Sequence, residues 1–392
     1  MTRRAVLIIL DGVGIGAAHD AQQYGDAGSD TLGNLARALG GLALPQLAAL
    51  GLGCIAPLAG VPPTPSPRAA FGSMQPASAG KDSTTGHWEI CGVHLERPFP
   101  VYPNGFPPAL IGAFETATGR SAIGNIAASG TEIIAQYAEE QRRTGAWIVY
   151  TSADSVFQIA ADESVIPLHE LYAACTTARE LLVEPHNVAR VIARPFVRSA
   201  DSYERTANRR DYSVAPPSET LLDTLARAGI ARHGIGKVDD LFAKRALTAR
   251  HTSSNAEGLA VIADFIRSSD SGLCFSNLVD FDQQYGHRND AAGFYGALRE
   301  FDRAVPMLID ALREDDLLII TADHGNDPTT PSTDHSRERV PLLVAGGAGG
   351  RRFRAQPLGE RATFSDVGAT LGDWFGVAYA GRGRSFLSEI TA

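Results

Sequence analysis

Three apolar stretches of this chain each end in aspartate, and this repeated pattern restricts the fold more than any other feature of the sequence. The stretches cover residues 5–10, 273–279 and 317–322, and they lead into Asp11, Asp280 with Asp282, and Asp323. Uninterrupted apolar runs of this length are typical of strands buried on both faces of a parallel sheet. In such sheets the ligand crevice lies outside the carboxyl ends of the strands. The aspartates are therefore predicted to meet at one edge of one sheet.

The segments between these strands favour an alternation of strands and helices, which is the pattern of an α/β fold. Amphipathic helices are predicted over residues 218–228 and 293–304. A further strand is predicted over residues 340–345, where Pro341 indicates either an edge strand or a strand-start position. We therefore expect a mostly parallel sheet flanked by helices.

The length of the chain, 392 residues, suggests two domains of ordinary size. Stretches rich in proline and turn residues at 97–108 and 215–217 are suited to domain boundaries. The segment between them has its own strand candidates at 146–151 and 188–193. We predict a core domain formed by residues 1–97 and 215–392, with residues 98–214 inserted into it as an α/β cap domain.

The composition argues against several classes of partner. The net charge of -9 and the pI near 5.6 predict a surface that repels nucleic acid and anionic membranes. No apolar run approaches the roughly 18 residues of a membrane span, and the first run is too short for an export signal. The four cysteines show neither paired nor metal-type spacing. We expect a cytoplasmic protein whose anionic ligands need a local cluster of metal or arginine.

Histidines lie close to two of the aspartates that end strands. His287 follows Asp282 by five residues, which is not the spacing of one α-helix face, so a loop is predicted there. His324 directly follows Asp323, and His335 lies shortly after. Any single pair is equally well explained by an aspartate that caps a helix and a histidine in a loop. Together they favour a divalent cation, since bare carboxylates would repel one another, and the mixed ligands suit Mn²⁺ or Zn²⁺ better than Ca²⁺.

Several motifs, in the same order along the chain, closely resemble the phosphopentomutase family of the alkaline phosphatase superfamily. They are DGVGIG (11–16), GKDSTTGHWE (80–89), VDFDQQYGH (279–287) and TADHGND (321–327), with shorter segments at 151–156 and 192–196. The likeness runs nearly end to end and implies an alkaline phosphatase-like core. It also implies two manganese ions, the first held by Asp11, Asp323 and His324 and the second by Asp282, His287 and His335.

The phosphorylated residue of this family is a threonine directly after Lys-Asp, and the corresponding position here is Ser83. A serine hydroxyl offers the same oxygen with less steric restriction, so the same chemistry is expected. Thr84 and Thr85 lie close enough to leave the assignment open, and any of these hydroxyls could instead cap the following turn.

The activity implied by the resemblance is that of a phosphopentomutase, an isomerase. Such an enzyme interconverts ribose 1-phosphate, or 2-deoxyribose 1-phosphate, and the 5-phosphate. The reaction proceeds through a phosphorylated enzyme and a bisphosphate intermediate, with a bisphosphate sugar as primer. Alternatives are a phosphoglycerate mutase-like enzyme or a metal-dependent phosphatase of the same superfamily, and a non-enzymatic protein that binds metal or sugar phosphate.

Four residues outside the metal set are candidates for binding the substrate. The distal phosphate is assigned to Arg194, Arg209 and Lys237, because cationic side chains, and the planar guanidinium above all, suit phosphate. Asp154 is assigned to the sugar hydroxyls. Each is equally well explained as a surface residue or, for Asp154, as a helix cap. The cap is predicted to act as a lid that keeps water from the phosphoryl group.

Overall fold

The computed structural model describes residues 3–152, 154–200, 202–268, 270–347 and 353–391, which form two compact units. The core unit comprises Met1–Pro98 and Pro216–Ala392, and the inserted unit comprises Phe99–Ala215. The function of the inserted unit as a cap stays a prediction.

The core unit is built on an eight-stranded sheet with the strand order β10-β9-β11-β1-β12-β13-β2-β14. In chain order the strands are β1 (Arg4–Leu10), β2 (Ala70–Met74), β9 (Arg232–Ile235), β10 (Thr248–Arg250), β11 (Gly272–Leu278), β12 (Asp316–Thr321), β13 (Val340–Gly346) and β14 (Pro357–Arg361). Every neighbouring pair is parallel except the two pairs that β13 makes with β12 and β2. The prediction of a mostly parallel α/β sheet is confirmed.

The three strands that the apolar runs predict lie side by side in the middle of this sheet. β1 pairs with β11 on one side and with β12 on the other, and all their residues are buried. Leu10 lies opposite Leu278, and Ile9 lies opposite Thr321. The chain therefore leaves all three strands at the same edge of the sheet.

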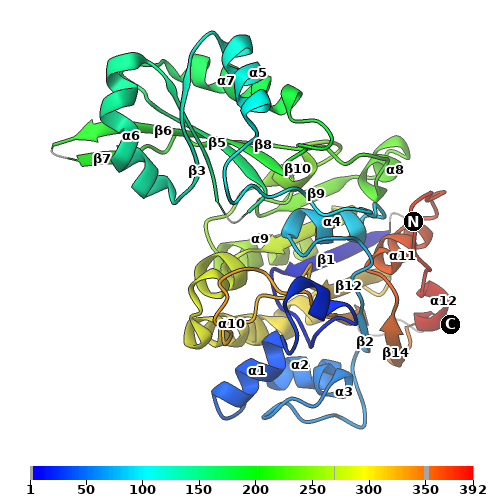
Figure 1. The fold of residues 1–392 in the computed structure, drawn as a ribbon. Coiled ribbons are helices and arrows are strands. Elements are labelled where there is room, and N and C mark those ends of the chain that lie inside the picture. Colours follow the sequence, from blue (N-terminus) through cyan, green and yellow to red (C-terminus); the bar gives the residue numbers. More distant parts are fainter. Residues whose placement is uncertain (1–2, 153, 201, 269, 348–352, 392) are drawn as a thin grey trace. The chain divides into compact units, whose positions relative to one another are not determined.

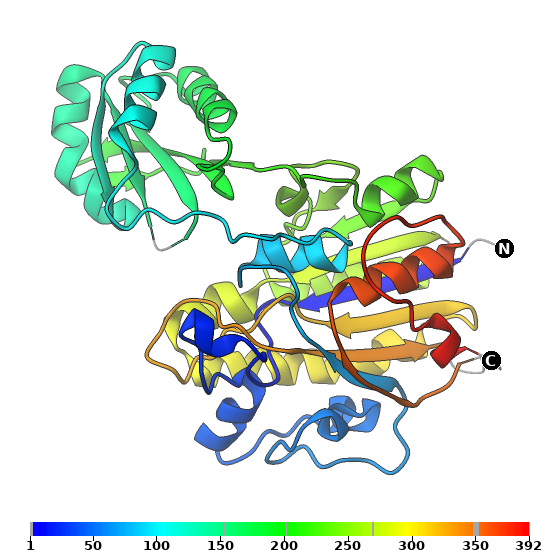
Figure 2. The same ribbon diagram turned by 45° about the vertical axis from the view of Figure 1, so that its right-hand side comes forward.

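Helices cover both faces of the core sheet (Figure 2). α9 (Asn255–Arg267) and α10 (Ala291–Asp310) pack together on one face, and α4 (Ser83–Ile90), α8 (Leu221–Arg227) and α11 (Ser365–Phe375) lie on the other. α8 and α10 confirm the helices predicted at 218–228 and 293–304. The shorter helices are α1 (Thr31–Ala38), α2 (Pro45–Leu50), α3 (Leu52–Ile55) and α12 (Leu387–Ile390).

Pro341 occupies the second position of β13, which lies between β12 and β2. The strand-start alternative is therefore correct, and the edge-strand alternative is wrong. The ladder with β12 begins only at Leu343, so the start of the strand accommodates a residue without an N–H group.

The inserted unit has its own sheet, with the order β3-β4-β5-β6-β7 and with β8 paired to β6 (Figure 1). The strands are β3 (Ala122–Ala127), β4 (Trp147–Thr151), β5 (Val156–Asp162), β6 (Arg190–Ser199), β7 (Ser202–Arg205) and β8 (Arg210–Ser213); the helices are α5 (Pro108–Thr118), α6 (Gly130–Thr144) and α7 (Leu168–Leu181). One apolar cluster packs beneath α5 and α7, and a second packs beneath α6. Among the described residues, no helix has the length and apolar character needed to span a bilayer.

Candidate metal centre

The six predicted metal ligands all lie at the carboxyl edge of β1, β11 and β12. They are contributed by the chain directly after β1 (Asp11), the turns after β11 (Asp282 and His287), the residues after β12 (Asp323 and His324) and the irregular segment before β13 (His335). The structure thus brings together side chains that lie far apart in the sequence, as the strand pattern predicts.

One group of ligand atoms comes from Asp282, His287 and His335, whose atoms lie within 4.8 Å of one another. Asp282 Oδ2 is 3.1 Å from His287 Nε2, and Asp282 Oδ1 is 3.4 Å from His335 Nε2. His287 Nδ1 lies 2.7 Å from the carbonyl oxygen of Thr333, to which it donates. This hydrogen bond orients the ring so that Nε2 faces the Asp282 carboxylate, and a second partner on the other ring nitrogen is usual for a metal-binding histidine.

A second group comes from Asp11, Asp282 and His324, again within 4.8 Å of one another. His324 Nε2 lies 3.2 Å from Asp11 Oδ1 and 3.5 Å from Asp323 Oδ2. Asp282 thus contributes to both groups, while the family resemblance assigns Asp323 to the ion held by Asp11 and His324. How Asp282 and Asp323 divide between two ions stays a prediction.

The residues after β11 form a π-helical turn, Phe281–Tyr285, followed by a 3₁₀ turn, Gly286–Arg288. The prediction of a loop between Asp282 and His287 is therefore wrong. A π-helical turn brings residues five apart onto one side, where an α-helix does not. Such turns are rare and are found mostly at functional sites.

Burial makes this cluster of charges costly in the absence of a cation. Asp11 is 4% exposed, Asp323 1% and His324 3%. Burial, together with the charge of Asp323, raises the pKa of Asp11. Burial alone would raise the pKa of Asp282 as well, but the imidazoles of His335 and His287 hold that pKa well below its usual range. Burial opposes the charge on His324, yet Asp323 and Asp11 raise its pKa well above that of a free histidine.

Three buried ligand atoms lack a hydrogen-bond partner among the described residues: Asp11 Oδ1, Asp323 Oδ2 and His335 Nε2. Buried polar atoms are rarely left without a partner, so each such atom requires an explanation. Divalent cations between these carboxylates and imidazoles would satisfy all three atoms and offset the repulsion. The donor set therefore fits divalent metal.

Two asparagines that the sequence pattern does not reveal orient the ligands. Asn277 Nδ2 donates to Asp11 Oδ2 over 2.8 Å, and Asn326 Nδ2 donates to Asp282 Oδ1 over 2.7 Å. His87, which belongs to the GKDSTTGHWE motif, also lies against a ligand: its Nδ1 is at ion-pair distance, 3.1 Å, from Asp323 Oδ2 and 2.9 Å from the carbonyl oxygen of Ser83. Partners of this kind hold metal ligands in one orientation.

Ser83 is the first residue of α4, and its Oγ lies 3.0 Å from His324 Nε2. The preceding Asp82 caps the helix and accepts hydrogen bonds from both the backbone N–H and the hydroxyl of Thr85. The Thr85 hydroxyl is therefore engaged by Asp82, whereas the Ser83 hydroxyl faces a predicted metal ligand. A Cβ atom on Gly86 would come within 2.1 Å of the Asp323 carbonyl oxygen, so this glycine lets α4 approach the end of β12.

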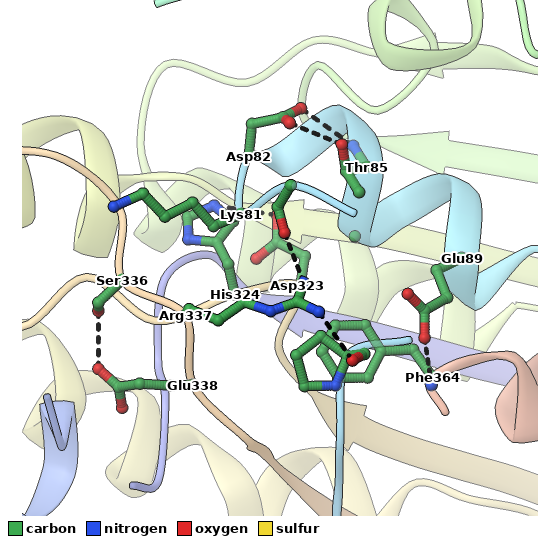
Figure 3. Close-up of a pocket in the computed structure, with 13 residues that line it drawn as sticks. Lys81, Asp82, Thr85, Glu89, Asp323, His324, Ser336, Arg337, Glu338 and Phe364 are labelled. Carbon is green, nitrogen blue, oxygen red and sulfur yellow. Dashed lines mark hydrogen bonds and ion pairs between the residues drawn. The ribbon is translucent and has the colours of Figure 1, made fainter. Parts of the chain in front are cut away.

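A small pocket lies beside this helix, lined by Lys81, Asp82, Thr85, Asp323, His324 and Arg337 among others (Figure 3). It has about 10 Å³ of free volume, which is room for roughly one water molecule. The pocket belongs to the packing around α4, because a pentose phosphate is far too large for it.

The four predicted substrate-binding residues are divided between the two units. Lys237 is exposed in the loop after β9 of the core unit. The other three belong to the inserted unit, where Arg194 Nε donates to Gln158 Oε1 over 3.0 Å and Arg209 makes two 2.7 Å hydrogen bonds with Asp211. Asp154 is exposed and lies 3.9 Å from Arg190, a cation outside the predicted set. Their roles in substrate binding stay predictions.

Comparison with known proteins identifies relatives over the full length of the chain. The model of the Metalloenzyme superfamily matches residues 3–379. A phosphopentomutase of Anaeromyxobacter dehalogenans is 54% identical over 394 residues, with 100% of each chain covered. Phosphopentomutases of Carboxydothermus hydrogenoformans and Dictyoglomus thermophilum are each 56% identical over 389 residues, covering 99% of this chain and 99% and 98% of theirs.

Proposed function

The chain belongs to the phosphopentomutase family of the metalloenzyme superfamily, and on that premise we propose that it moves a phosphoryl group between the 1- and 5-positions of a pentose phosphate by way of Ser83. The substrates would be ribose 1-phosphate or 2-deoxyribose 1-phosphate and the corresponding 5-phosphates. Relatives more than half identical over the whole chain favour this activity over that of a phosphoglycerate mutase or a phosphatase.

One observation carries the assignment of Ser83: its hydroxyl oxygen lies 3.0 Å from His324 Nε2, inside the group of predicted metal ligands. Its neighbours Thr84 and Thr85 are buried, and the Thr85 hydroxyl donates to Asp82 over 2.6 Å. Ser83 also begins an eight-residue helix, whose free N–H groups and dipole favour negative charge at that end. The position therefore suits a residue that carries a phosphoryl group.

The carboxylates and imidazoles described above would hold two divalent ions, which we propose to be Mn²⁺. When bound, such ions supply the positive charge that neutralises the carboxylates and the transferring phosphoryl group. Asn277 and Asn326 keep the Asp11 and Asp282 carboxylates turned toward this position. Phosphate on Ser83 adds about -1.5 to -2 charge at neutral pH, which these carboxylates alone would repel.

The proposed cycle starts from phosphorylated Ser83. A free hydroxyl of the pentose monophosphate attacks the phosphorus: the bond from phosphorus to Ser83 Oγ breaks and a bond to the sugar oxygen forms. The proton that the sugar hydroxyl loses replaces the phosphoryl group on Ser83 Oγ, which ends the step as a free hydroxyl. The resulting bisphosphate turns round and returns its other phosphoryl group to Ser83 Oγ. A bisphosphate sugar would prime an enzyme that has lost its phosphate.

Binding of the distal phosphate is proposed for Arg194, Arg209 and Lys237, and binding of the sugar hydroxyls for Asp154. Arg209 presents two guanidinium nitrogens to Asp211, the same paired geometry that a phosphate accepts. The inserted unit is proposed to keep water away during transfer, because water would compete with the sugar hydroxyl. A cytoplasmic location stays a prediction from the sequence.

The test is peptide mass spectrometry of active enzyme together with three parallel assays. We expect one phosphate on the peptide that contains Ser83. We expect turnover of ribose 1-phosphate to exceed that of 3-phosphoglycerate and of an aryl phosphate. Fully active enzyme without phosphate on Ser83 would contradict the proposed cycle, and faster turnover of either other substrate would contradict the proposed specificity.

A further inference from the structure

The loop that leads from β2 into α4 has its backbone groups held by side chains from other parts of the core unit. Glu89 accepts hydrogen bonds from the N–H groups of Ala77 and Ser78, the shorter of them 2.6 Å from Ser78 N. Glu89 is 1% exposed and also accepts from Thr363 Oγ1 and from the N–H group of Phe364. One buried carboxylate thus fixes two N–H groups of the loop.

Arg337 binds the carbonyl side of the same loop (Figure 3). Its Nη1 donates to the carbonyl oxygens of Ser78 over 2.7 Å and of Gly80 over 2.5 Å, and its Nη2 donates to that of Pro76 over 3.0 Å. Arg337 is 3% exposed, and its charge is balanced by Asp20, which accepts from Nε over 3.0 Å and from Nη2 over 2.9 Å. The guanidinium therefore contacts three alternate carbonyl groups that precede Ser83.

Arg337 lies two residues after His335, so it connects the segment that carries a predicted metal ligand with the loop that carries Ser83. Two residues of the β1–α1 connection strengthen this link. The ring of Tyr24 lies 4.6 Å from the Arg337 guanidinium, and its hydroxyl accepts from Gly80 N over 3.2 Å. Asp26 accepts from Arg337 N over 2.8 Å and from Lys81 Nζ over 3.0 Å.

Only an arginine can make this set of contacts. The guanidinium carries five N–H donors in a rigid plane, whereas the lysine ammonium is a single point with three donors. A loop bound on both its N–H and carbonyl sides has little freedom to shift. Displacement of a reacting group by about 1 Å can lower a rate on the order of 100-fold, so rigidity here affects catalysis directly.

We propose that Arg337 and Glu89 are positioning residues that fix the Ser83 hydroxyl relative to the metal ligands His335 and His324. The inference rests on the proposed role of Ser83 and adds how that residue is held. Neither residue is among the predicted metal ligands, and no hydrogen bond or ion pair described above joins either of them to one. Their loss is therefore expected to impair phosphoryl transfer while metal binding persists.

The test compares Arg337→Lys with Arg339→Lys, which alters the next arginine of the same segment. Arg339 donates to Glu360 and to the carbonyl oxygen of Ile15, and in the described part of the chain it makes no such contact with the loop before Ser83. We expect Arg337→Lys to lower kcat, and the rate of phosphorylation of Ser83 by a sugar bisphosphate, by on the order of 100-fold. KM and the Mn²⁺ affinity measured by titration calorimetry are expected to match those of the wild type, and Arg339→Lys is expected to behave like the wild type throughout.

Glu89→Gln provides an independent variant, because its amide has one acceptor oxygen in place of two and puts an NH2 group where the carboxylate now accepts hydrogen bonds. The same loss of kcat with retained Mn²⁺ affinity is expected. Arg337→Lys enzyme with wild-type kcat, or with kcat and Mn²⁺ affinity lost in parallel, would overturn the proposal. Failure of the proposed function would give a different result, because the wild-type enzyme would then be active without phosphate on Ser83.

Discussion

The hydroxyl oxygen of Ser83 lies 3.0 Å from Nε2 of His324, although 241 residues separate the two along the chain. One side chain begins a helix and the other follows a central strand, so their meeting depends on α4 packing against the end of β12. This contact joins the proposed carrier of the phosphoryl group to the proposed metal centre, and the predictions below test both.

Removal of the Ser83 hydroxyl is expected to abolish mutase turnover. Ser83→Ala is predicted to lower kcat by at least about a thousandfold, as loss of a nucleophile does in other enzymes. Ser83→Thr keeps an oxygen at the same position and is expected to retain both turnover and the phosphopeptide. Activity is measured as ribose 5-phosphate formed from ribose 1-phosphate, with Mn²⁺ affinity as the control for an intact site. Substantial turnover by Ser83→Ala would exclude Ser83 as the carrier.

Divalent metal is expected to stabilise the folded protein, because it relieves the repulsion among Asp11, Asp282 and Asp323. A ligand present at one hundred times its Kd adds about 2.7 kcal/mol to the free energy of unfolding. We therefore expect Tm to rise when Mn²⁺ is added to chelator-treated protein. Asp282→Asn, which alters a carboxylate that contacts both His287 and His335, is expected to lose most of that rise. An equal rise in this variant would count against the assigned ligands.

Glu338 is predicted to make stability depend on pH. Burial raises the pKa of this carboxyl to about 7, and the nearby Asp327 charge adds to the effect. Because the folded state favours the protonated form, the stabilisation is complete below about pH 4.5 and is lost as the pH rises through about 7. The free energy of unfolding is expected to fall by roughly 3 kcal/mol over that window.

Glu338→Gln removes the titrating group and serves as the comparison. Denaturant unfolding of both chelator-treated proteins between pH 4.5 and 8 isolates the contribution of Glu338, since all other groups are shared. A flatter profile for the variant is the expected result. Identical profiles would show that Glu338 does not titrate in this range.

Gly86 is predicted to be essential to the packing of α4. Gly86→Ala would place its Cβ 2.1 Å from the Asp323 carbonyl oxygen, so the helix must move away from the end of β12. We expect a loss of about 1–3 kcal/mol in the free energy of unfolding, together with reduced turnover. Gly296→Ala in α10 is the control, because its Cβ would have no neighbour within 4 Å among the residues that the structure describes, and it is expected to gain about 0.4–1 kcal/mol. Equal effects of the two changes on unfolding would contradict the close packing of α4.

Arg209 is predicted to contribute to affinity for the substrate phosphate. Arg209→Gln removes the positive charge and leaves one amide nitrogen where the guanidinium presents a pair of nitrogens. Hydrogen bonds to charged groups contribute about 1.5–3 kcal/mol. We expect KM for ribose 5-phosphate to rise on the order of 10- to 100-fold, with Mn²⁺ affinity unchanged. An unchanged KM would remove Arg209 from the set of phosphate ligands.

The sequence predicts the central part of the fold because one physical rule applies to it. Long apolar runs can be buried only as interior strands or helices, and the aspartates mark where those runs end. That rule does not predict the position of β13 in the sheet. Pro341 indicates either an edge strand or the start of a strand, and only the pairing of β13 with β12 and β2 distinguishes the two.

The residues that orient the ligands, and those proposed to hold the loop before Ser83, are harder to find. Asn277 is one polar residue inside a buried strand. Glu89 and Arg337 form hydrogen bonds with backbone groups, and no sequence pattern shows which backbone groups a side chain will bind. The π-helical turn after β11 is likewise missed, since the spacing of Asp282 and His287 fits an irregular loop equally well. These features depend on the close approach of segments far apart in the chain, which local patterns do not encode.

Residues 99–215 fold around apolar clusters of their own, whereas every predicted metal ligand and Ser83 are encoded on either side of them. A recombination event that exchanged this one contiguous stretch would leave the order of the eight core strands intact. If the inserted unit recognises the substrate, as proposed, such an exchange would alter which molecule is bound without rebuilding the metal centre, and a protein engineer has the same two junctions available for a graft.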